Sequence, residues 1–323
     1  FMHKQNTNVQ LALPGTLDLA QDVHALFDAS KARNTQRAYK AAWEDFDDWC
    51  RRFNCTPLPA TPAALANYLR LQSEFSGVAT LNMRLAAISF FHRVHHQVDP
   101  TKAIEVVTIM EGIRRKLGTA PNKKAPVTRD QLAQMVAALP DTLTGKRDKA
   151  LLLIGFAGAF RRSELVALDV RHVAFLDDRA VITLARSKTD QEGRGAKKHI
   201  PRMGGDLCPV AALQSWLAAA GIRAGPIFRK VDRWGKLGEH RMNAGTVAQI
   251  VKDAACAAGL NPDAVSGHSL RSGFITSAAG RDVAEWKIQQ VSKHKSVDVL
   301  RGYIQDAGQG GLEAIREVLW EER

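Results

Sequence analysis

Six side chains capable of acid–base or nucleophilic chemistry occur in order along the second half of the chain. They are Arg161 in AFRRSEL, Lys188 in ARSKTD, His268 and Arg271 in GHSLR, His294 in SKHKS and Tyr303 in LRGYI. An arginine offers a planar, permanently charged fork of donors, and a histidine can exchange a proton near neutral pH. A phenol becomes a nucleophile once it loses its proton. Each motif alone is common in ion pairs and packed helices, so only the ordered set is informative.

The ordered set resembles the tyrosine recombinase (lambda-integrase) family. The active site of that family draws an Arg, a Lys, an H-x-x-R pair, a His or Trp, and a Tyr from one C-terminal domain. Arg161 ends an apolar helical run, and His294 precedes Tyr303 by nine residues, as in the family. The resemblance extends from about residue 20 to the end of the chain and is Cre-like in its build. His294 departs from the Cre pattern, which has a tryptophan there.

The resemblance implies that DNA is cut and rejoined through a 3′-phosphotyrosyl bond at Tyr303, without metal, ATP or another cofactor. The transition state of this reaction gathers charge on the non-bridging phosphate oxygens, which Arg161 and Arg271 would clamp. His268 and His294 would add hydrogen bonds to the same oxygens. Either histidine could accept the proton of the tyrosine.

Lys188 is expected to protonate the departing 5′ oxygen from a hairpin. Glu164 is expected to orient the catalytic side chains from beside Arg161, although an ordinary salt bridge would have the same sequence pattern. Elimination favours Tyr303 as the nucleophile, because Tyr39 and Tyr68, the other two tyrosines, fall on apolar helical faces.

Candidate metal and redox motifs are weak. His92 and His96 lie one helical turn apart with no evident third ligand, which favours a surface or phosphate-facing pair over a metal site. The cysteines show no C-x-x-C spacing and predict buried or partly buried free thiols. They are Cys50, Cys55, Cys208 and Cys256.

The composition suits a polyanionic partner. The chain has 323 residues, and 45 Lys and Arg against 33 Asp and Glu give a formal charge of +12. The longest apolar run, residues 150–160, is shorter than the roughly 20 residues of a membrane-spanning helix. The N-terminal segment lacks the apolar core of a secretory signal. We therefore expect a cytoplasmic, DNA-associated protein without a membrane partner.

The first part of the chain reads as helical. After a flexible terminus over residues 1–15, helical periodicity runs from 16 to 117. Thr61 followed by Pro62 predicts an N-cap and a helix start. A buried aromatic stripe is predicted from side chains three and four residues apart. The stripe consists of Tyr39, Trp43, Phe46 and Trp49. Four or five short helices thus predict an all-α, core-binding (DNA-binding) domain.

The second part reads as a mixed domain. Residues 118–127 are rich in Gly, Pro and Lys and predict a linker. Thr128 and Gln131 form a capping box that begins a catalytic domain over 128–309. Strands are predicted at 172–175, 180–184 and 198–201. The fold class is therefore mainly α with two domains, the second being α+β with one small antiparallel sheet.

Clusters of basic side chains would let two domains close around a duplex as a clamp, which is how the family binds DNA. Phosphate contacts would then dominate the affinity. The predicted DNA-binding residues are Lys31, Arg33, Arg37, Arg114, Arg115, Lys116, Lys123, Lys124, Arg194, Lys197 and Lys198.

The C-terminal segment 310–323 predicts a helix with one apolar face. The face is formed by Leu312, Ile315, Val318 and Leu319. The resemblance implies that this helix docks on a neighbouring subunit, giving a dimer on one site and a tetramer in the synapse. Packing on its own domain is the alternative.

Two other functions fit part of the pattern. A type IB topoisomerase shares the catalytic residue types, but the small helical first domain and the apolar tail argue against it. A non-catalytic DNA-binding regulator with the same fold is opposed by the complete catalytic set. The sequence does not specify the target site or the choice among integration, excision and dimer resolution.

Overall fold

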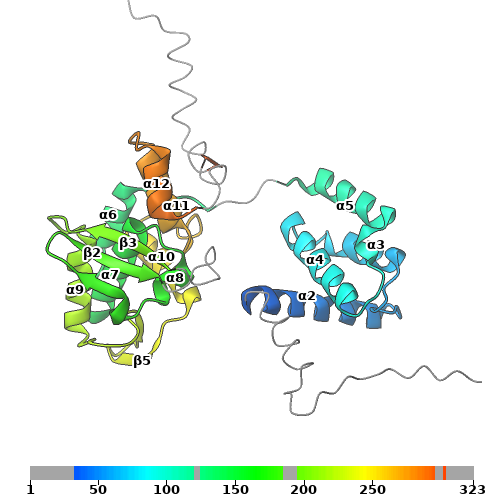
Figure 1. Cartoon of the computed structure of the whole chain (residues 1–323), viewed down its shortest axis with the longest axis horizontal. Coiled ribbons are helices and arrows are strands. Elements are labelled where there is room, and N and C mark those ends of the chain that lie inside the picture. The colour runs from blue at the N-terminus through cyan, green and yellow to red at the C-terminus, as the bar shows by residue number, and fades with distance from the viewer. Residues whose placement is uncertain (1–32, 120–123, 185–194, 295–300, 303–323) are drawn as a thin grey trace, which may run out of the picture. The chain divides into compact units, whose positions relative to one another are not determined.

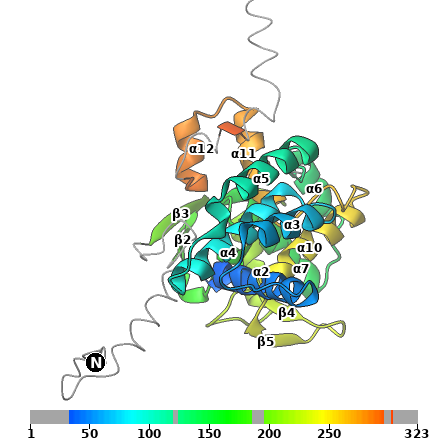
Figure 2. The same cartoon turned by 90° about the vertical axis from the view of Figure 1, so that its right-hand side faces the viewer.

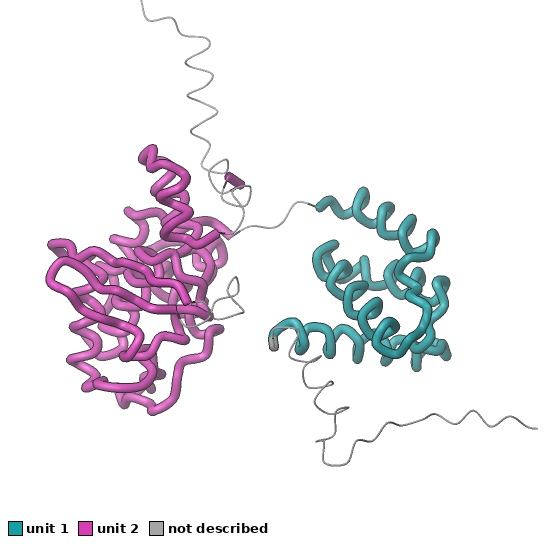
Figure 3. The backbone as a smooth tube through the Cα atoms, viewed as in Figure 1, with its two compact units in different colours: residues 1–122 teal, residues 123–323 magenta. Residues whose placement is uncertain are grey.

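A computed structural model of the chain describes residues 33–119, 124–184, 195–294 and 301–302. The chain divides into two compact units, with unit 1 ending at Asn122 and unit 2 beginning at Lys123 (Figure 3). The division falls inside the segment predicted as a linker. The two units are described separately.

Unit 1 is helical throughout its described residues (Figure 1). Its elements are α2 (Arg33–Arg52), α3 (Pro62–Gln72), α4 (Val78–Val94), a 3-10 turn (Pro100–Lys102) and α5 (Ile104–Leu117). The predicted start of α3 is confirmed, because the Thr61 side chain accepts a hydrogen bond from the Ala64 amide at 3.2 Å.

The core of unit 1 is aromatic. Of the predicted buried stripe, Phe46 and Trp49 are buried, whereas Tyr39 and Trp43 are half-buried. Phe46 packs edge-on against the buried ring of Tyr68. The Tyr68 hydroxyl donates to the Asp45 carboxylate at 2.5 Å, and Asp45 is also 3.3 Å from the Arg84 guanidinium. The Tyr68 hydroxyl and the Arg84 guanidinium are therefore both paired with Asp45 at the edge of this core.

His92 differs from its prediction as a surface residue. Its side chain is buried, and Nε2 accepts from the Ala60 amide at 2.9 Å. The neutral ring therefore carries its proton on Nδ1, which lies 2.8 Å from the Ile88 carbonyl. His96 is exposed. The predicted surface pair is wrong for His92, which acts as a core hydrogen-bonding group.

Unit 2 contains seven α-helices among its described residues. They are α6 (Arg129–Ala137), α7 (Leu143–Ala157), α8 (Arg162–Val166), α9 (Pro209–Ala219), α10 (Ala244–Ala257), α11 (Ser269–Ala279) and α12 (Glu285–Ser292). The predicted capping box at the start of α6 is confirmed, with reciprocal bonds between Thr128 and Gln131. The apolar segment 150–154 of α7 is buried in the centre of the core.

The predicted antiparallel sheet is present. It has the order β1 (Val173–Phe175), β2 (Arg179–Leu184), β3 (Ala196–Pro201), and Thr183 pairs with Lys197. A second sheet was not predicted. It consists of β4 (Arg229–Val231) and β5 (Leu237–Arg241), and β5 lies at the opposite end of unit 2 from α12 (Figure 2). These two strands are charged and half-exposed, so they lack the apolar alternation that would have indicated them.

The four cysteines differ in exposure. Cys50 and Cys208 are buried, Cys55 is half-buried and Cys256 is exposed, so the prediction of buried or partly buried thiols is wrong for Cys256. Burial raises the pKa of the Cys50 thiol to about 11. No helix in the described ranges is long and apolar enough to cross a membrane.

Candidate active site

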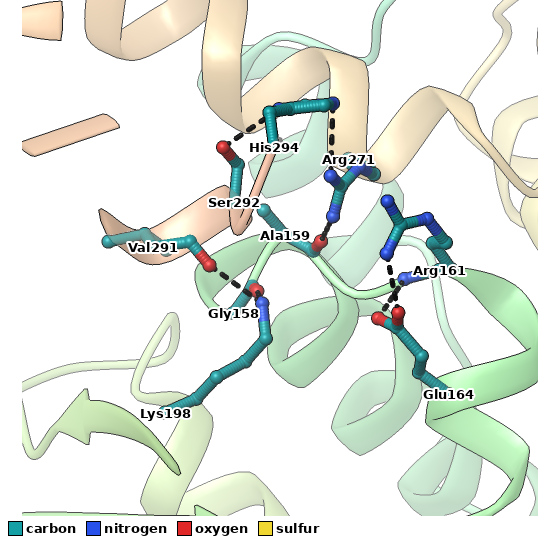
Figure 4. A network of polar contacts seen from close by, with 9 residues as sticks. All are labelled: Gly158, Ala159, Arg161, Glu164, Lys198, Arg271, Val291, Ser292 and His294. Carbon is teal, nitrogen blue, oxygen red and sulfur yellow. Dashed lines mark hydrogen bonds and ion pairs between the residues drawn. The ribbon is translucent and has the colours of Figure 1, made fainter. Parts of the chain in front are cut away.

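A tight turn connects α7 to α8 and places two carbonyl groups at the candidate site. Gly158 is required there, because an added Cβ would lie 2.1 Å from the Phe160 ring. Ala159 has a φ of +46°, in the left-handed region that non-glycine residues rarely adopt. Figure 4 shows the Gly158 and Ala159 carbonyls bonded to two buried cations, Lys198 and Arg271.

Arg161 follows this turn and caps α8. Glu164, one helical turn later and 4% exposed, accepts from the Arg161 amide at 3.0 Å and from its guanidinium at 2.7 Å. The Arg161 side chain remains 18% exposed. The carboxylate therefore fixes both the backbone and the guanidinium of Arg161, while the side chain as a whole stays partly accessible.

Arg271 reaches the same turn from α11. Its side chain is 1% exposed and donates to the Ala159 carbonyl at 2.6 Å, across 112 positions of sequence. A second nitrogen lies 3.0 Å from His294 Nε2. Because a guanidinium only donates, Nε2 accepts this bond. The predicted residues Arg161, Arg271 and His294 thus converge around one turn (Figure 4).

His294 follows α12 and is neutral at pH 7. Burial, and then the nearby Arg271 guanidinium, lowers the pKa of His294 to about 4. Since Nε2 accepts, the neutral ring carries its proton on Nδ1, which lies 2.9 Å from the Ser292 hydroxyl. Lys293, between these two residues, has a φ of +55°.

His268 stands at the N-cap of α11, one turn before Arg271. The residue is exposed, yet the surrounding protein removes part of the water from its ring. This desolvation, followed by the charges of Arg271 and Arg161, lowers the pKa of His268. Both candidate histidines therefore favour the neutral form, which can accept a proton.

Lys198 differs from its prediction as a DNA contact. Its side chain is 4% exposed. Its ammonium donates to the Gly158 carbonyl and, at 2.7 Å, to the Val291 carbonyl, and it lies over the Phe160 ring. Burial lowers the pKa of Lys198 to about 7. The sequence did not lead us to expect Lys198 inside the site. Strand alternation is the signal that could have found it, since Lys197 and Lys198 must face opposite sides of β3.

The remaining predicted site residues fall into two groups. Those exposed on the described surface are Arg37, Arg114, Arg115, Lys116, Lys124 and Lys197. Of these, Lys124 donates to the Asp263 carbonyl at 2.7 Å and Arg114 to Asn82 at 3.2 Å. The predicted residues that lie outside the described side chains are Lys31, Arg33, Lys123, Lys188, Arg194, Tyr303 and the segment 310–323.

The described part of the site has an excess of positive charge. Glu164 is the one carboxylate among the groups that shift the Lys198 pKa, and it is opposed by Arg271, Arg161 and Lys293. Preorganised cations and hydrogen-bond donors of this kind stabilise an anion and the charge that develops on it during a reaction. No cluster of three potential metal-ligating side chains occurs among the residues that the structure describes.

Comparisons with known proteins agree with this chemistry. The model of the phage integrase family matches residues 126–309. An integrase/recombinase XerD homolog of Selenomonas ruminantium is 39% identical over 284 residues, covering 86% of this chain and 83% of the relative. The recombinase Cre of Escherichia phage P1 is 23% identical over 278 residues, covering 80% of each chain.

Solved structures share the fold. A lambda integrase dimer bound to a COC′ core site matches with a TM-score of 0.60 and 16% identity, over 94% of this chain and 78% of that one. The family match spans more than half of the chain, and the XerD homolog is similar over most of its length. The chain therefore belongs to the phage integrase family of tyrosine recombinases, enzymes that break and rejoin DNA.

Proposed function

We propose that this chain recombines duplex DNA at a specific site through a 3′-phosphotyrosyl bond to Tyr303. The observation that carries the assignment of residues is the convergence of Arg161, Arg271 and His294 on the turn after α7. The relatives and solved structures that this chain resembles are recombinases and integrases, which does not favour a topoisomerase. We place the protein with DNA in the cytoplasm.

The two arginines would bind the scissile phosphate. Each is anchored by a group other than the substrate, Arg161 by Glu164 and Arg271 by the Ala159 carbonyl. Little reorganisation is then needed when charge develops on the phosphate oxygens. A phosphate oxygen that bonds to Arg271 would also compete with His294 for the shared donor, which would free the lone pair of His294 Nε2.

Proton transfer would accompany both halves of the exchange. The Tyr303 oxygen forms a bond to phosphorus, and its proton passes to His268 or His294, both of which favour the neutral form. The bond between phosphorus and the 5′ oxygen breaks, and Lys188 protonates that oxygen. The bond energy stays in the phosphotyrosine, so a 5′ hydroxyl can reverse the reaction without ATP.

Trapping on a nicked duplex tests this proposal. Wild type is first used to select bound sequences from random DNA, and a nick is then placed in the selected site so that cleavage cannot be reversed. Wild type and Tyr39→Phe should form a covalent adduct. Tyr303→Phe should bind the DNA but form none, because only the attacking oxygen is lost. An adduct with Tyr303→Phe would contradict the assignment.

The role of Lys188 is tested by replacing the bridging 5′ oxygen with sulfur, because a thiolate leaves without a proton. Lys188→Ala should slow cleavage of the oxygen substrate ~10²- to 10⁴-fold and cleavage of the sulfur substrate far less. Equal losses on both substrates would remove Lys188 from the general-acid role.

The partner is double-stranded DNA, and we propose a dimer on one site and a tetramer in the synapse. Support comes from the helical spacing of the apolar residues in segment 310–323. Deletion of 310–323 should spare binding of one monomer to a half-site but abolish assembly and recombination. Size measurements on site-bound complexes decide this, and tetramers of the truncated chain would contradict it.

A further inference from the structure

One buried ammonium joins three segments of unit 2. Lys198 on β3 is 4% exposed, whereas the adjacent Lys197 faces solvent. Its Nζ donates to the Gly158 carbonyl, 40 positions away, and to the Val291 carbonyl, 93 positions away (Figure 4). Lys198 therefore connects β3 to the turn before Arg161 and to the end of α12.

The first of these contacts supports the arginine turn. Gly158 and Ala159 present consecutive carbonyls, one to Lys198 and the other to Arg271. The left-handed backbone of Ala159 is strained, and such a conformation persists only where the surroundings hold it. Two cations on adjacent carbonyls are such a restraint, and the turn leads directly into Arg161.

The second contact supports the histidine turn. Val291 is followed by Ser292, whose hydroxyl lies 2.9 Å from His294 Nδ1. Lys293, between Ser292 and His294, also has a left-handed backbone. The bond from Lys198 to the Val291 carbonyl thus holds the point where the chain leaves α12 and turns toward the site.

A buried ammonium that bridges two carbonyls has an unfavourable electrostatic free energy. Burial removes its hydration, and the charges of Arg271 on α11, Arg161 before α8 and Lys293 after α12 oppose its own. Glu164 on α8 is the group that favours it. A neutral donor would join the two carbonyls with less desolvation. The positive charge is therefore unfavourable in the free protein, and a bound anion would stabilise it.

We propose that Lys198 is a positioning residue that holds the arginine turn and the histidine turn in register, and that its charge is balanced when a DNA phosphate binds to Arg161 and Arg271. The inference rests on the proposed function, since that phosphate is the one to be cleaved. Lys198 acts through the two carbonyls and the electrostatic field, and it transfers no proton in the reaction.

The first test separates positioning from a general surface charge. Lys198→Met keeps the length of the stem and removes the donor and the charge. With saturating nicked duplex of the selected sequence, adduct formation should slow about 10- to 100-fold, as for other residues that orient a catalytic group. Lys236→Met is the matched control, exposed next to β5 at the far end of unit 2, and should keep the wild-type rate.

The second test measures the number of protons taken up when DNA binds, which a lysine with only a structural role would not affect. The pKa of Lys198 is about 7 in the free protein, so at pH 8 most of the side chain is neutral. A phosphate at the arginines should restore its proton. Calorimetric titration of the unnicked duplex in buffers of different ionisation heat counts this uptake. Both proteins contain Tyr303→Phe, which prevents cleavage. The proton uptake should be smaller in the protein that also contains Lys198→Met than in the protein that retains Lys198.

The outcomes can be told apart. No adduct with wild type overturns the proposed function. An adduct with wild type, together with an unchanged rate or unchanged proton uptake in Lys198→Met, overturns the present inference alone. If Lys198→Met does not fold, Lys198→Gln retains a donor without charge and should still be slow. A wild-type rate in Lys198→Gln, or no proton uptake at pH 8 by the Tyr303→Phe protein itself, also overturns the inference.

Discussion

The two units bury polar side chains in different ways. In unit 1, His92 is a neutral ring between two backbone groups, and the charge of Asp45 is matched by Arg84. In unit 2, Arg271 and Lys198 are buried cations that donate to backbone carbonyls. His92, Arg271 and Lys198 all have hydrogen-bond partners, but only the cations of unit 2 leave positive charge that the described neighbours do not balance.

This difference distinguishes polar groups that stabilise a core from cations that bind an anion. A fully matched polar group adds specificity to a core, and removing it mainly costs free energy of folding. An unbalanced cation lowers stability where it is buried and gains interaction energy when an anion arrives. We therefore expect substitution of His92 in unit 1 to change mainly stability, and substitution of the buried cations Arg271 and Lys198 in unit 2 to change the rate of cleavage as well.

Among these buried polar side chains, the largest effect is expected at Arg271. Arg271→Ala should slow adduct formation at saturating DNA by ~10²- to 10³-fold, because one preorganised donor to the transition state is lost. Single-turnover trapping on the nicked duplex measures this rate. A loss below tenfold would show that the buried guanidinium serves mainly to pack α11 against the turn after α7.

His92 provides the opposite case. His92→Ala should lower the free energy of unfolding of unit 1 by about 1 to 3 kcal/mol, because the Ala60 amide loses its buried acceptor. Urea titration measures the loss. The rate of cleavage by the folded protein should stay at the wild-type value. His96→Ala, exposed one turn away, is the control and should change stability by less than about 0.5 kcal/mol.

Lys198 should make the stability of unit 2 depend on pH. Its pKa is about 7 in the folded state, below the ~10.4 of an unfolded chain. The unfolded state therefore binds more protons between these values, so stability rises with pH across this window. The gain from pH 7 to pH 9 should be roughly 2 kcal/mol. Lys198→Met should lack this gain, and equal pH profiles for both proteins would contradict the burial of a charge.

The smallest effect is expected at Lys197. Its exposed side chain is predicted to contact a phosphate, so Lys197→Met should weaken binding to all sequences alike. The slope of log affinity against log salt concentration should decrease by about 0.9. Fluorescence anisotropy over a salt series would measure it. An unchanged slope would show that this face of β3 does not contact DNA.

Local signals in the sequence were sufficient for several elements. The cap at Thr61 and the box at Thr128 depend on residues within one turn, so the chain around them determines the outcome. The spacing of Arg161 and Glu164 likewise specifies a contact within one helix start. These predictions succeed because their partners are neighbours in sequence.

Other features depend on partners that are distant in sequence. A histidine pair one turn apart has the same spacing on a surface and in a core, and only the approach of Ala60 places His92 inside. Whether Lys197 or Lys198 faces inward depends on the register of β3 against β2. The charged strands β4 and β5 carry no alternating pattern, so pairing alone defines them.

Because the four thiols differ in exposure, one of them can be labelled selectively to follow DNA binding by unit 2. Cys256 is the exposed one, on α10, a helix that packs against α8. A maleimide fluorophore should therefore react first at Cys256, well ahead of the buried Cys50 and Cys208. Energy transfer from this dye to one at the end of a duplex would follow the arrival of unit 2 on DNA in single molecules, with Cys256→Ser as the unlabelled reference.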